Sequence, residues 1–369
     1  MGLSKPQKEH DESYYMASQW SLMGKKLKKH KLAMVSLVLL ILLYLQAIFA
    51  DFLGVQGLTT YDSQYLNCPP TRIHLFDKDG TFRGPFVYGL KTERDPETMR
   101  KIFTADESAI YPIRFFSEGE EYTVFGKSMN LHFMTVEEPG RLFLFGTDNM
   151  GRDIYSRIAL GSRISLSIPL VGVAISFVLG LIIGSISGYC GGMIDAIIQR
   201  IIEVIRSFPT LPLWMALSAA IPPKVPVTQM FIYITVILSF ISWTDLARVV
   251  RSKFLSLKNE DYVMAAKIAG VSDIKVISTH LVPGFLSYLV VNMTLGIPNM
   301  ILGETSMSFL GLGIRSPATS WGVLLQEAQE IQNVALYAWK LIPLLFVIVT
   351  VLAFNFLGDG LRDAADPYK

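Results

Sequence analysis

The feature that most constrains this chain is a set of long stretches without a charged side chain. Thirty-one consecutive residues between Arg163 and Asp195 are uncharged, and about 20 mostly apolar residues suffice for a helix to cross a hydrocarbon core of about 30 Å. The deficit of charged residues extends over the rest of the chain, since residues 163–369 hold only 14 Lys/Arg and 12 Asp/Glu. So few charges cannot solvate a globular surface of that size. The sequence therefore predicts an integral membrane protein.

The intervals between charges predict an all-α polytopic domain with six transmembrane helices. Their expected ranges are 32–50 and about 164–188, 200–221, 226–247, 283–303 and 339–358. The first span is expected to be retained as an anchor. Residues 48–50 (Ile-Phe-Ala) lack the small residue that a signal-peptide cleavage site carries three positions before the cut.

The distribution of Lys and Arg predicts the orientation of these spans. Five lysines lie between residues 25 and 31, and basic residues flanking a span stay on the cytoplasmic side. Residues 1–31 are thus expected to form a cytoplasmic tail, and six spans return the C-terminus to the same side. The loop 248–283 then lies in the cytoplasm, which agrees with its six Lys/Arg.

No residue pattern supports enzymatic chemistry, so the chain is expected not to be an enzyme. The nearest approach to a phosphate-binding loop, residues 125–128, has Glu121 where such a loop needs its first glycine. The five histidines show no metal-ligand spacing. A net charge of +2 gives no basic field for nucleic acid. We expect no cofactor or metal in this chain, no nucleic-acid partner, and any energy for transport from another chain.

The second span carries a stripe of small residues spaced four apart. The stripe consists of Gly172, Ser176, Gly180, Gly184 and Gly188. Small residues at this spacing let two helix backbones approach closely in lipid. The stripe can be a close helix contact or a pore-lining seam, and the contact is favoured.

Acidic residues near the spans are expected at the span edges, as interfacial anchors. They are Asp195, Glu203, Asp245 and Glu304. A proton- or sodium-driven carrier would show ionisable residues near mid-membrane. The arrangement therefore disfavours such a carrier.

The most informative segment is residues 258–283, within the cytoplasmic loop. Asn259 is the expected N-cap of a short helix, and Gly270 fits the left-handed position after its end. A second short helix follows. Ala265 and Ala266 give the first helix a flat face against which another protein could lie.

This segment resembles the cytoplasmic EAA loop of bacterial ABC importer permeases. Ala265, Ala266, Gly270 and Pro283 stand at the spacing of that loop, whereas Met264 takes the position of the usual glutamate. Three further blocks resemble the oligopeptide/dipeptide branch of the family. They are GTDNMGRDIYSR (146–157), GYCGGMID (188–195) with Phe-Pro at 208–209, and SFLGLG (308–313) with SWG (320–322) and GDGLRD (358–363).

The resemblance implies a type I importer permease fold over residues 146–369 and a role as transmembrane subunit of an ATP-driven importer of di- or oligopeptides. Such a subunit pairs with a homologous permease as a heterodimer. Its other partners are two ABC ATPase subunits, an extracytoplasmic solute-binding protein, the peptide and membrane lipid. ATP and Mg would be bound by the ATPases. The resemblance further implies a bacterial inner-membrane protein with both termini cytoplasmic.

The resemblance also assigns roles to individual residues. The ATPase-coupling residues would be Asp261, Tyr262, Met264, Ala265, Ala266, Gly270, His280 and Pro283. The structural residues of the family motif would be Gly146, Thr147, Asp148, Gly151, Arg152, Asp153 and Arg157. From local rules, Thr147 or Asp148 is the expected N-cap there, and Asp153 and Arg157 are expected to pair at i,i+4.

Residues 51–145 form an insertion between the first two spans, expected to be a small β-rich extracytoplasmic domain. Lys78-Asp79-Gly80 predicts a hairpin between 73–76 and Phe82. Strands are also expected at 122–125 and 142–145, and a helix around 96–103. The insertion could seat the binding protein, rest on the partner permease, or pack passively beside the spans.

The alternative function is a non-energised channel or a scaffold whose outer domain binds a partner. Co-purification of an ATPase with the chain would separate the two. An intramembrane enzyme is disfavoured, because the sequence offers no nucleophile–base pair and no metal site.

Overall fold

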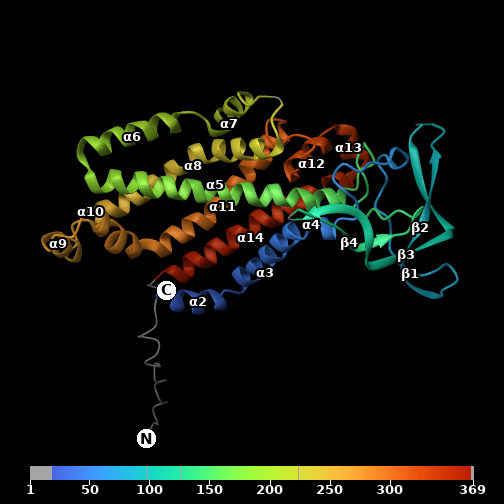
Figure 1. Cartoon of the computed structure of the whole chain (residues 1–369), viewed down its shortest axis with the longest axis horizontal. Helices are drawn as coiled ribbons and strands as arrows, with labels where there is room; N and C mark the ends of the chain where they lie inside the picture. The colour runs from blue at the N-terminus through green and yellow to red at the C-terminus, as the bar shows by residue number, and fades with distance from the viewer. Residues whose placement is uncertain (1–18, 98, 125, 223, 367–369) are drawn as a thin grey trace, which may run out of the picture.

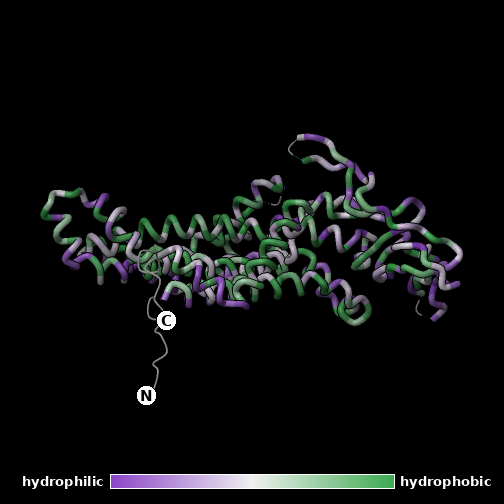
Figure 2. Tube along the Cα trace, turned by 90° about the horizontal axis from the view of Figure 1, so that it is seen from below, coloured by the Kyte–Doolittle hydropathy of each residue, from purple (hydrophilic) through white to green (hydrophobic). Residues whose placement is uncertain are grey.

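A bundle of long helices with a β-sheet at one end makes up the structure, a computed structural model that describes residues 19–97, 99–124, 126–222 and 224–366 (Figure 1). Residues 1–18 of the expected tail lie outside the described residues. The main helices are α3 (Lys31–Ile48), α5 (Ile154–Cys190), α8 (Val227–Leu257), α11 (Leu286–Phe309) and α14 (Ile342–Ala365), preceded by α2 (Gln19–Lys29). Within the described ranges, five helices are long and apolar enough to cross a membrane. Figure 2 shows hydrophobic residues along the middle of the bundle and hydrophilic ones toward both ends.

The segment expected to be a helix over 200–221 is not continuous but is broken into α6 (Gly192–Ser207) and α7 (Thr210–Ala219). The break falls at Phe208, whose φ of −88° and ψ of 136° are extended. Pro209 causes it, since proline lacks the N–H of a helical residue and disfavours helical geometry in the residue before it. Both helices pack along α8 (Figure 1).

Two of the long helices extend past the charges that were expected to delimit them. α5 begins at Ile154 rather than near 164, and α8 continues to Leu257 rather than ending near 247. Charged residues do not end a helix when they find partners beyond the hydrocarbon core. Arg163 of α5, for example, donates to the backbone oxygens of Ala47 and Ile48 at 2.8 and 3.1 Å.

The small residues of α5 face α8, so the predicted close helix contact is confirmed. A Cβ on Gly184 would lie 2.6 Å from the carbonyl oxygen of Ala247. A Cβ on Gly188 would lie 2.6 Å from the Cβ of Phe254. The backbones of α5 and α8 can approach this closely only because side chains are missing along the stripe.

An antiparallel sheet in the order β1-β2-β3-β4 occupies one end of the molecule. Its strands are β1 (His74–Phe76), β2 (Phe82–Arg94), β3 (Lys101–Val124) and β4 (Lys127–Val136). Phe76 is paired with Phe82 across the first hairpin, with Gly80 at a φ of 77° in the turn. The long strand β3 pairs with β2 along its first half and with β4 along its second.

Two expected elements of this region are wrong. The segment expected to be a helix around 96–103 is a turn followed by β3, because Lys101 pairs with Arg94 and the strand ladder overrides local helix preference. Residues 142–145 are not a strand. The oxygen of Phe143 accepts from the N–H of Thr71 at 2.8 Å and from the N–H of Gly146 at 3.2 Å, which is a turn contact and not a strand ladder.

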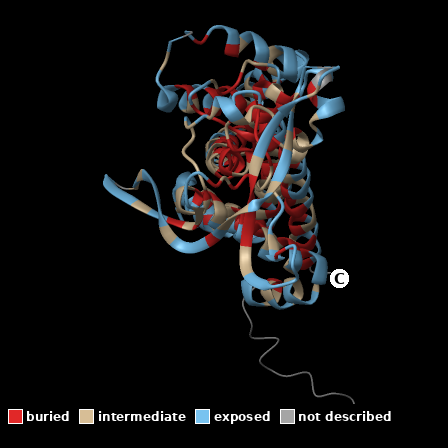
Figure 3. Ribbon diagram, turned by 90° about the vertical axis from the view of Figure 1, so that its right-hand side faces the viewer, coloured by how far each residue is buried: buried red, intermediate tan, exposed pale blue. Residues whose placement is uncertain are grey.

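Short elements lie at the end of the bundle next to the sheet (Figure 1). These elements are α4 (Ala50–Leu53) and η1 (Ser63–Tyr65) after α3, and α12 (Trp321–Ala328), α13 (Ile331–Leu336) and η4 (Ala338–Leu341) between α11 and α14. Trp321 of α12 is fully buried against α5 and α14, and its indole N–H donates to the carbonyl of Ile158 at 3.1 Å. Figure 3, which looks along the bundle from the sheet end, shows the buried residues gathered in its middle.

Glu304 was expected at a span edge as an interfacial anchor, and this expectation is wrong. It is fully buried within α11, where the hydroxyl of Ser308 donates to Oε1 at 2.7 Å. The short helix α12 and its preceding loop close over this position, because a Cβ on Gly322 would lie 2.7 Å from Ser308. The end of the span is therefore covered by protein rather than by the membrane interface.

Candidate coupling site

The predicted docking loop lies at the end of the bundle opposite the sheet (Figure 1). It contains α9 (Asp261–Ile268), α10 (Asp273–Lys275), a π-helical turn η2 (Val276–Leu281) and a 3-10 turn η3 (Val282–Phe285) that leads into α11. The N-cap of α9 is Glu260 and not Asn259. Asn259 belongs to the turn that ends α8, in which the N–H of Glu260 donates to the oxygen of Leu257 at 3.1 Å.

Gly270 ends α9 as predicted. Its φ is 76°, and its N–H donates to the oxygen of Lys267 at 3.0 Å. The N–H of Val271 donates to the oxygen of Ala266 at 3.1 Å. This pair of bonds is the Schellman motif, which places a residue with positive φ directly after the helix. A Cβ at Gly270 would meet nothing within 4 Å, so the backbone conformation alone calls for glycine.

One face of α9 is packed against the bundle. Val263 and Ala266 are buried, in a cluster with Phe254 of α8 and with Leu281 and Phe285 of the segment entering α11. A force on α9 would therefore act directly on the ends of two long helices.

The rest of the α9 surface is exposed and partly apolar. Tyr262, Met264 and Ile268 are exposed, Ile268 at 85%. Ala265 is also exposed whereas Ala266 is buried, so the alanine pair does not form one face as expected. The two positions are one residue apart, about 100° around a helix, and point to different surroundings. Asp261 is exposed one turn before Met264.

The second half of the loop is held by the end of α5. The hydroxyl of Tyr189 donates to the carboxylate of Asp273, and the Nζ of Lys267 lies 4.7 Å from the centre of the Tyr189 ring. Of the other predicted coupling residues, His280 is half-buried and Pro283 is exposed. Tyr189 was not predicted as part of this site; only its place in the GYCGG block could have indicated it.

An ion pair next to the site fastens α6 to α8. The Nε and Nη2 atoms of Arg251 lie 2.5 Å from the two carboxylate oxygens of Asp195. The guanidinium holds the pKa of Asp195 below its ordinary value. The α6 helix is thereby fixed beside the same end of the bundle.

The predicted motif residues 146–157 lie at the other end of the molecule, where α5 begins beside the sheet. Asp148 is their centre: its Oδ2 accepts from the Nε of Arg152 at 2.7 Å and from the Nη1 of Arg157 at 2.6 Å. Glu327 of α12 accepts from both arginines as well. Sequence reasoning missed Glu327, because nothing local indicates a partner so far away along the chain.

Asp153, and neither Thr147 nor Asp148, is the N-cap of α5. Its Oδ2 accepts from the N–H of Ser156 at 2.8 Å and from its hydroxyl at 2.5 Å. Burial raises the pKa of Asp153 to about 6. The expected i,i+4 pair with Arg157 is wrong, since that guanidinium points to two carboxylates outside its own helix.

The motif glycines allow other segments to pass close by. Gly146 has a φ of 74°, and a Cβ there would lie 2.6 Å from the oxygen of Cys68. Gly151 has a φ of 80°, and a Cβ there would overlap the backbone of Asp62. Between them, the oxygen of Thr147 accepts from the indole N–H of Trp339 at 3.1 Å. The motif therefore brings two distant segments, around residues 62–68 and around Trp339, against the start of α5.

The two predicted groups of residues are thus at opposite ends of the bundle and make separate sites. Neither end offers a metal site: in the part of the chain that the structure describes, no group of three or more His, Cys, Asp or Glu is placed to hold an ion.

Comparison with known proteins finds two family models, each of which matches one segment of the chain. Residues 180–368 match the family model of the binding-protein-dependent transport system inner membrane component. Residues 18–70 match the N-terminal transmembrane domain of oligopeptide transport permease C.

Curated relatives agree with these matches. The oligopeptide transport system permease protein of Salmonella typhimurium is 41% identical over 224 residues, covering 60% of this chain and 72% of the relative. The dipeptide transport system permease protein of Bacillus subtilis is 37% identical over 224 residues, covering 60% and 68%. Among solved structures, an inward-facing form of a methionine ABC transporter aligns with 18% identity and a TM-score of 0.46, covering 56% of this chain and 96% of that one.

Proposed function

This chain belongs to the family of binding-protein-dependent transport system inner membrane components, and we propose that it is the permease subunit of an ATP-driven importer of di- or oligopeptides. As a member of that family it is a multi-pass inner-membrane transport component and not an enzyme. The peptide cargo is proposed from the names of the relatives, which handle oligopeptides and dipeptides.

The observation that carries the coupling proposal is the exposed face of α9. Met264 and Ile268, four residues apart on one side of α9, present apolar surface at the end of the bundle opposite the sheet, and Tyr262 is exposed beside them. Large exposed apolar groups rimmed by charge are typical of a protein interface. We assign this face to one of two ABC ATPases, which hold ATP and Mg, with Asp261 supplying the negative charge that the usual glutamate would carry.

The proposed movement follows from the packing of the opposite face. ATPase closure displaces α9, and Val263 transmits the displacement to Phe254 of α8 and Phe285 before α11. The ATPases thereby favour one of two arrangements of the spans over the other. His280 and Pro283 take part as residues of the turns between α9 and α11.

The proposed topology has six crossings, with α6 and α7 together as the broken third. Both termini and the loop 248–283 lie in the cytoplasm, which the lysines before α3 and the basic residues of the loop support. The insertion 51–145, with its sheet, is then extracytoplasmic. It is where the solute-binding protein would be received.

The proposed translocation path runs between this permease domain, residues 146–369, and a homologous permease. A cavity of about 250 Å³ between α5, α8 and α11 supports a lining role for this chain. Its polar lining includes Ser242, Asn292 and Asn299. Amide side chains both donate and accept hydrogen bonds, as peptide backbones require.

Gly270→Val, with Gly80→Val as matched control, tests the coupling proposal. Gly270 has a φ of 76° and Gly80 a φ of 77°, and a Cβ at either position would meet nothing within 4 Å. Valine therefore imposes the same backbone strain at opposite ends of the molecule. In the assembled transporter, Gly270→Val is expected to weaken co-purification of the ATPases, and Gly80→Val to retain it, because Gly80 lies in the insertion, far from the proposed ATPase-docking face. Equal ATPase retention in both variants would show that this loop is not the docking element.

The alternative, a non-energised channel or scaffold, makes a different prediction. In that case no ATPase would co-purify with the chain. Loss of the ATPase on Ala265→Arg, with the wild type retaining it, would decide for the importer, because Ala265 is exposed on the proposed docking face.

A further inference from the structure

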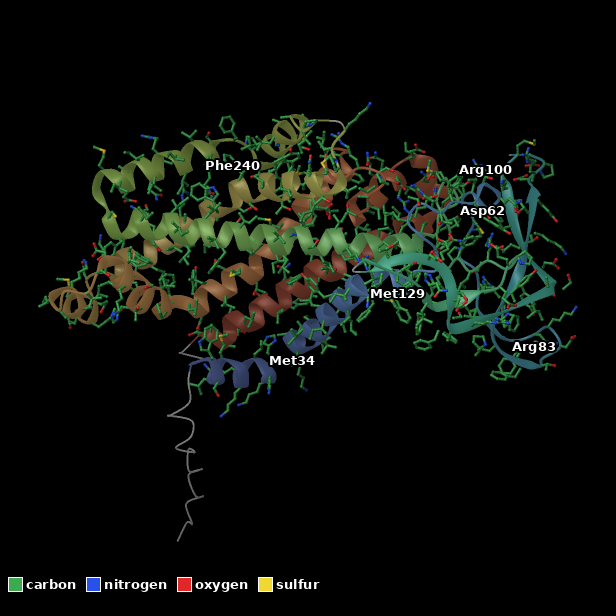
Figure 4. The ribbon with its side chains drawn as sticks, in the orientation of Figure 1. Met34, Asp62, Arg83, Arg100, Met129 and Phe240 are labelled. Carbon is green, nitrogen blue, oxygen red and sulfur yellow. The ribbon has the colours of Figure 1, made fainter. Side chains whose placement is uncertain are left out.

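A cavity of about 830 Å³ lies where the sheet end of the bundle meets the sheet, away from both sites described above. Three elements form its walls: the end of α3 with α4, one face of α5, and the hairpin of β3 and β4. Figure 4 labels Met129 of this hairpin where it returns to α4. The volume lies within the range of small-molecule sites.

The walls are mostly apolar and the apolar groups are exposed. Ile48, Leu170 and Met129, one from each wall, are large hydrophobic residues open to the surroundings. Along α5 the lining continues through Leu166 to Leu170, which lies seven residues, or about 10 Å, further from the sheet than Arg163. The cavity is therefore apolar toward the middle of the bundle.

The end of the cavity nearer the sheet is charged. The Nη2 of Arg163 lies 2.7 Å from the Oδ2 of Asp51, at the level where α3 ends. The other contacts of this guanidinium go to the oxygens of Ala47 and Ile48. The side chain of Arg163 is 40% exposed and that of Asp51 is 18% exposed, so both charged groups remain accessible from the cavity. A positively charged hydrogen-bond donor and a negatively charged acceptor therefore lie side by side at this end of the cavity.

We propose that this cavity binds one zwitterionic phospholipid of the phosphatidylethanolamine type. The phosphate accepts from Nη1 of Arg163, the ammonium donates to Oδ1 of Asp51, and an acyl chain lies along Leu166 and Leu170. Arginine and phosphate form strong charge-assisted hydrogen bonds, and the apolar lining replaces water around the chain.

The pair of charges distinguishes this lipid from other membrane lipids. An anionic headgroup brings no positive group to Asp51, so its carboxylate stays unpaired next to added negative charge. A choline headgroup is zwitterionic but has no N–H to donate to Oδ1. The site therefore prefers phosphatidylethanolamine to both phosphatidylglycerol and phosphatidylcholine.

The test uses the assembled transporter in nanodiscs and a phosphatidylethanolamine with a photoreactive acyl chain. Crosslinks are expected in peptides containing residues 44–52 and 163–170. Unlabelled phosphatidylethanolamine is expected to compete about tenfold better than phosphatidylglycerol or phosphatidylcholine, the scale of one charge-assisted hydrogen bond.

Two variants and a control locate the site. Leu170→Trp fills the cavity from an exposed position and is expected to reduce crosslinking about tenfold, while Asp51→Asn is expected to remove the preference over phosphatidylglycerol. Glu203→Gln, which breaks an exposed pair with Arg200 on α6, is the matched control and should change neither. Crosslinks elsewhere, or equal competition by all three lipids, would overturn the proposal. Capture of the second permease, instead of lipid, by a photoreactive residue at position 170 would also overturn the proposal.

Discussion

Arg157 and Glu327 stand 170 residues apart in the chain and form a paired contact, with Nη1 2.5 Å from Oε2 and Nη2 2.9 Å from Oε1. The contact joins α12 to the first turn of α5. The side chain of Arg157 is only 4% exposed, so its charge depends on Glu327 and Asp148 for compensation.

Replacing Glu327 with glutamine should therefore destabilise the protein markedly. Removing one partner of a buried ion pair leaves charge uncompensated, and with Asp148 still present we expect a loss of about 2–3 kcal/mol. Thermal unfolding in detergent measures it. Arg200→Gln breaks a pair whose side chains are 79% and 53% exposed, and should cost about 0.5 kcal/mol or less. Equal effects of the two changes would contradict the role of this contact.

The contact between α5 and α8 predicts a sharp difference between two helix glycines. Gly184→Leu places a Cβ 2.6 Å from the oxygen of Ala247 and should cost about 1–3 kcal/mol by forcing the helices apart. Gly296→Ala in α11 has its nearest neighbour at 3.6 Å and should be neutral or stabilising by up to about 1 kcal/mol. Unfolding temperatures of both variants check this. A tolerated leucine at 184 would mean that the seam is not close-packed.

The buried N-cap predicts a pH-dependent stability. The pKa of Asp153 is about 6 in the folded protein, against about 3.9 in an unfolded chain. A raised pKa means that the folded state binds the proton more tightly. The contribution of Asp153 is then fully present below about pH 3.9 and is lost as the pH rises through about 6.

Asp153→Asn keeps an acceptor for Ser156 and removes this loss. The variant should gain stability relative to the wild type as the pH rises from 4 to 7, by on the order of 2–3 kcal/mol. The pKa of Asp106 is instead lowered to about 2, chiefly by its hydrogen bonds to Ser108 and Lys91. Asp106→Asn should therefore show no such trend between pH 4 and 7, and serves as the control. A stability difference for Asp153→Asn that stays constant with pH would refute the buried, titrating cap.

The proposed topology predicts which side of the membrane each end of the bundle faces. With the exposed Cys190 replaced by serine, a cysteine at Lys78 should react with an impermeant thiol reagent applied to intact cells, and one at Asn259 should not. Cys68 is fully buried, and burial raises the pKa of its thiol to about 12, so it should stay unlabelled in the folded protein. Labelling at 259 from outside would reverse the proposed orientation.

Sequence reasoning located the five long apolar helices of the described residues and the helix end at Gly270, because local rules govern both. Uncharged stretches of sufficient length and a glycine after a short helix need no knowledge of distant residues. It failed wherever a partner came from far along the chain. The interruption at Pro209 is visible in the sequence itself, but the burial of Glu304 is not, since α12 covers it from outside its own helix.

The site at the start of α5 illustrates the same limit. The sequence identified the right residues, from Gly146 to Arg157, but paired Asp153 with Arg157 by helix spacing. In the structure, Asp153 accepts a hydrogen bond from Ser156, and Arg157 pairs with Glu327. The i,i+4 spacing shows which side chains can pair within one helix. It does not show which residues of another helix compete for the same side chain.

The exposure of Ile268 and Ile274, 85% and 81%, has a consequence for the life of the protein before assembly. A newly made chain that has not met whatever covers α9 presents two bare isoleucines on adjacent short helices. Exposed apolar groups of this kind promote association between unassembled copies, and chaperones and proteases act on such species. If the proposed ATPase covers this surface, the abundance of this chain in the cell should follow the supply of that ATPase, with surplus copies degraded rather than stored.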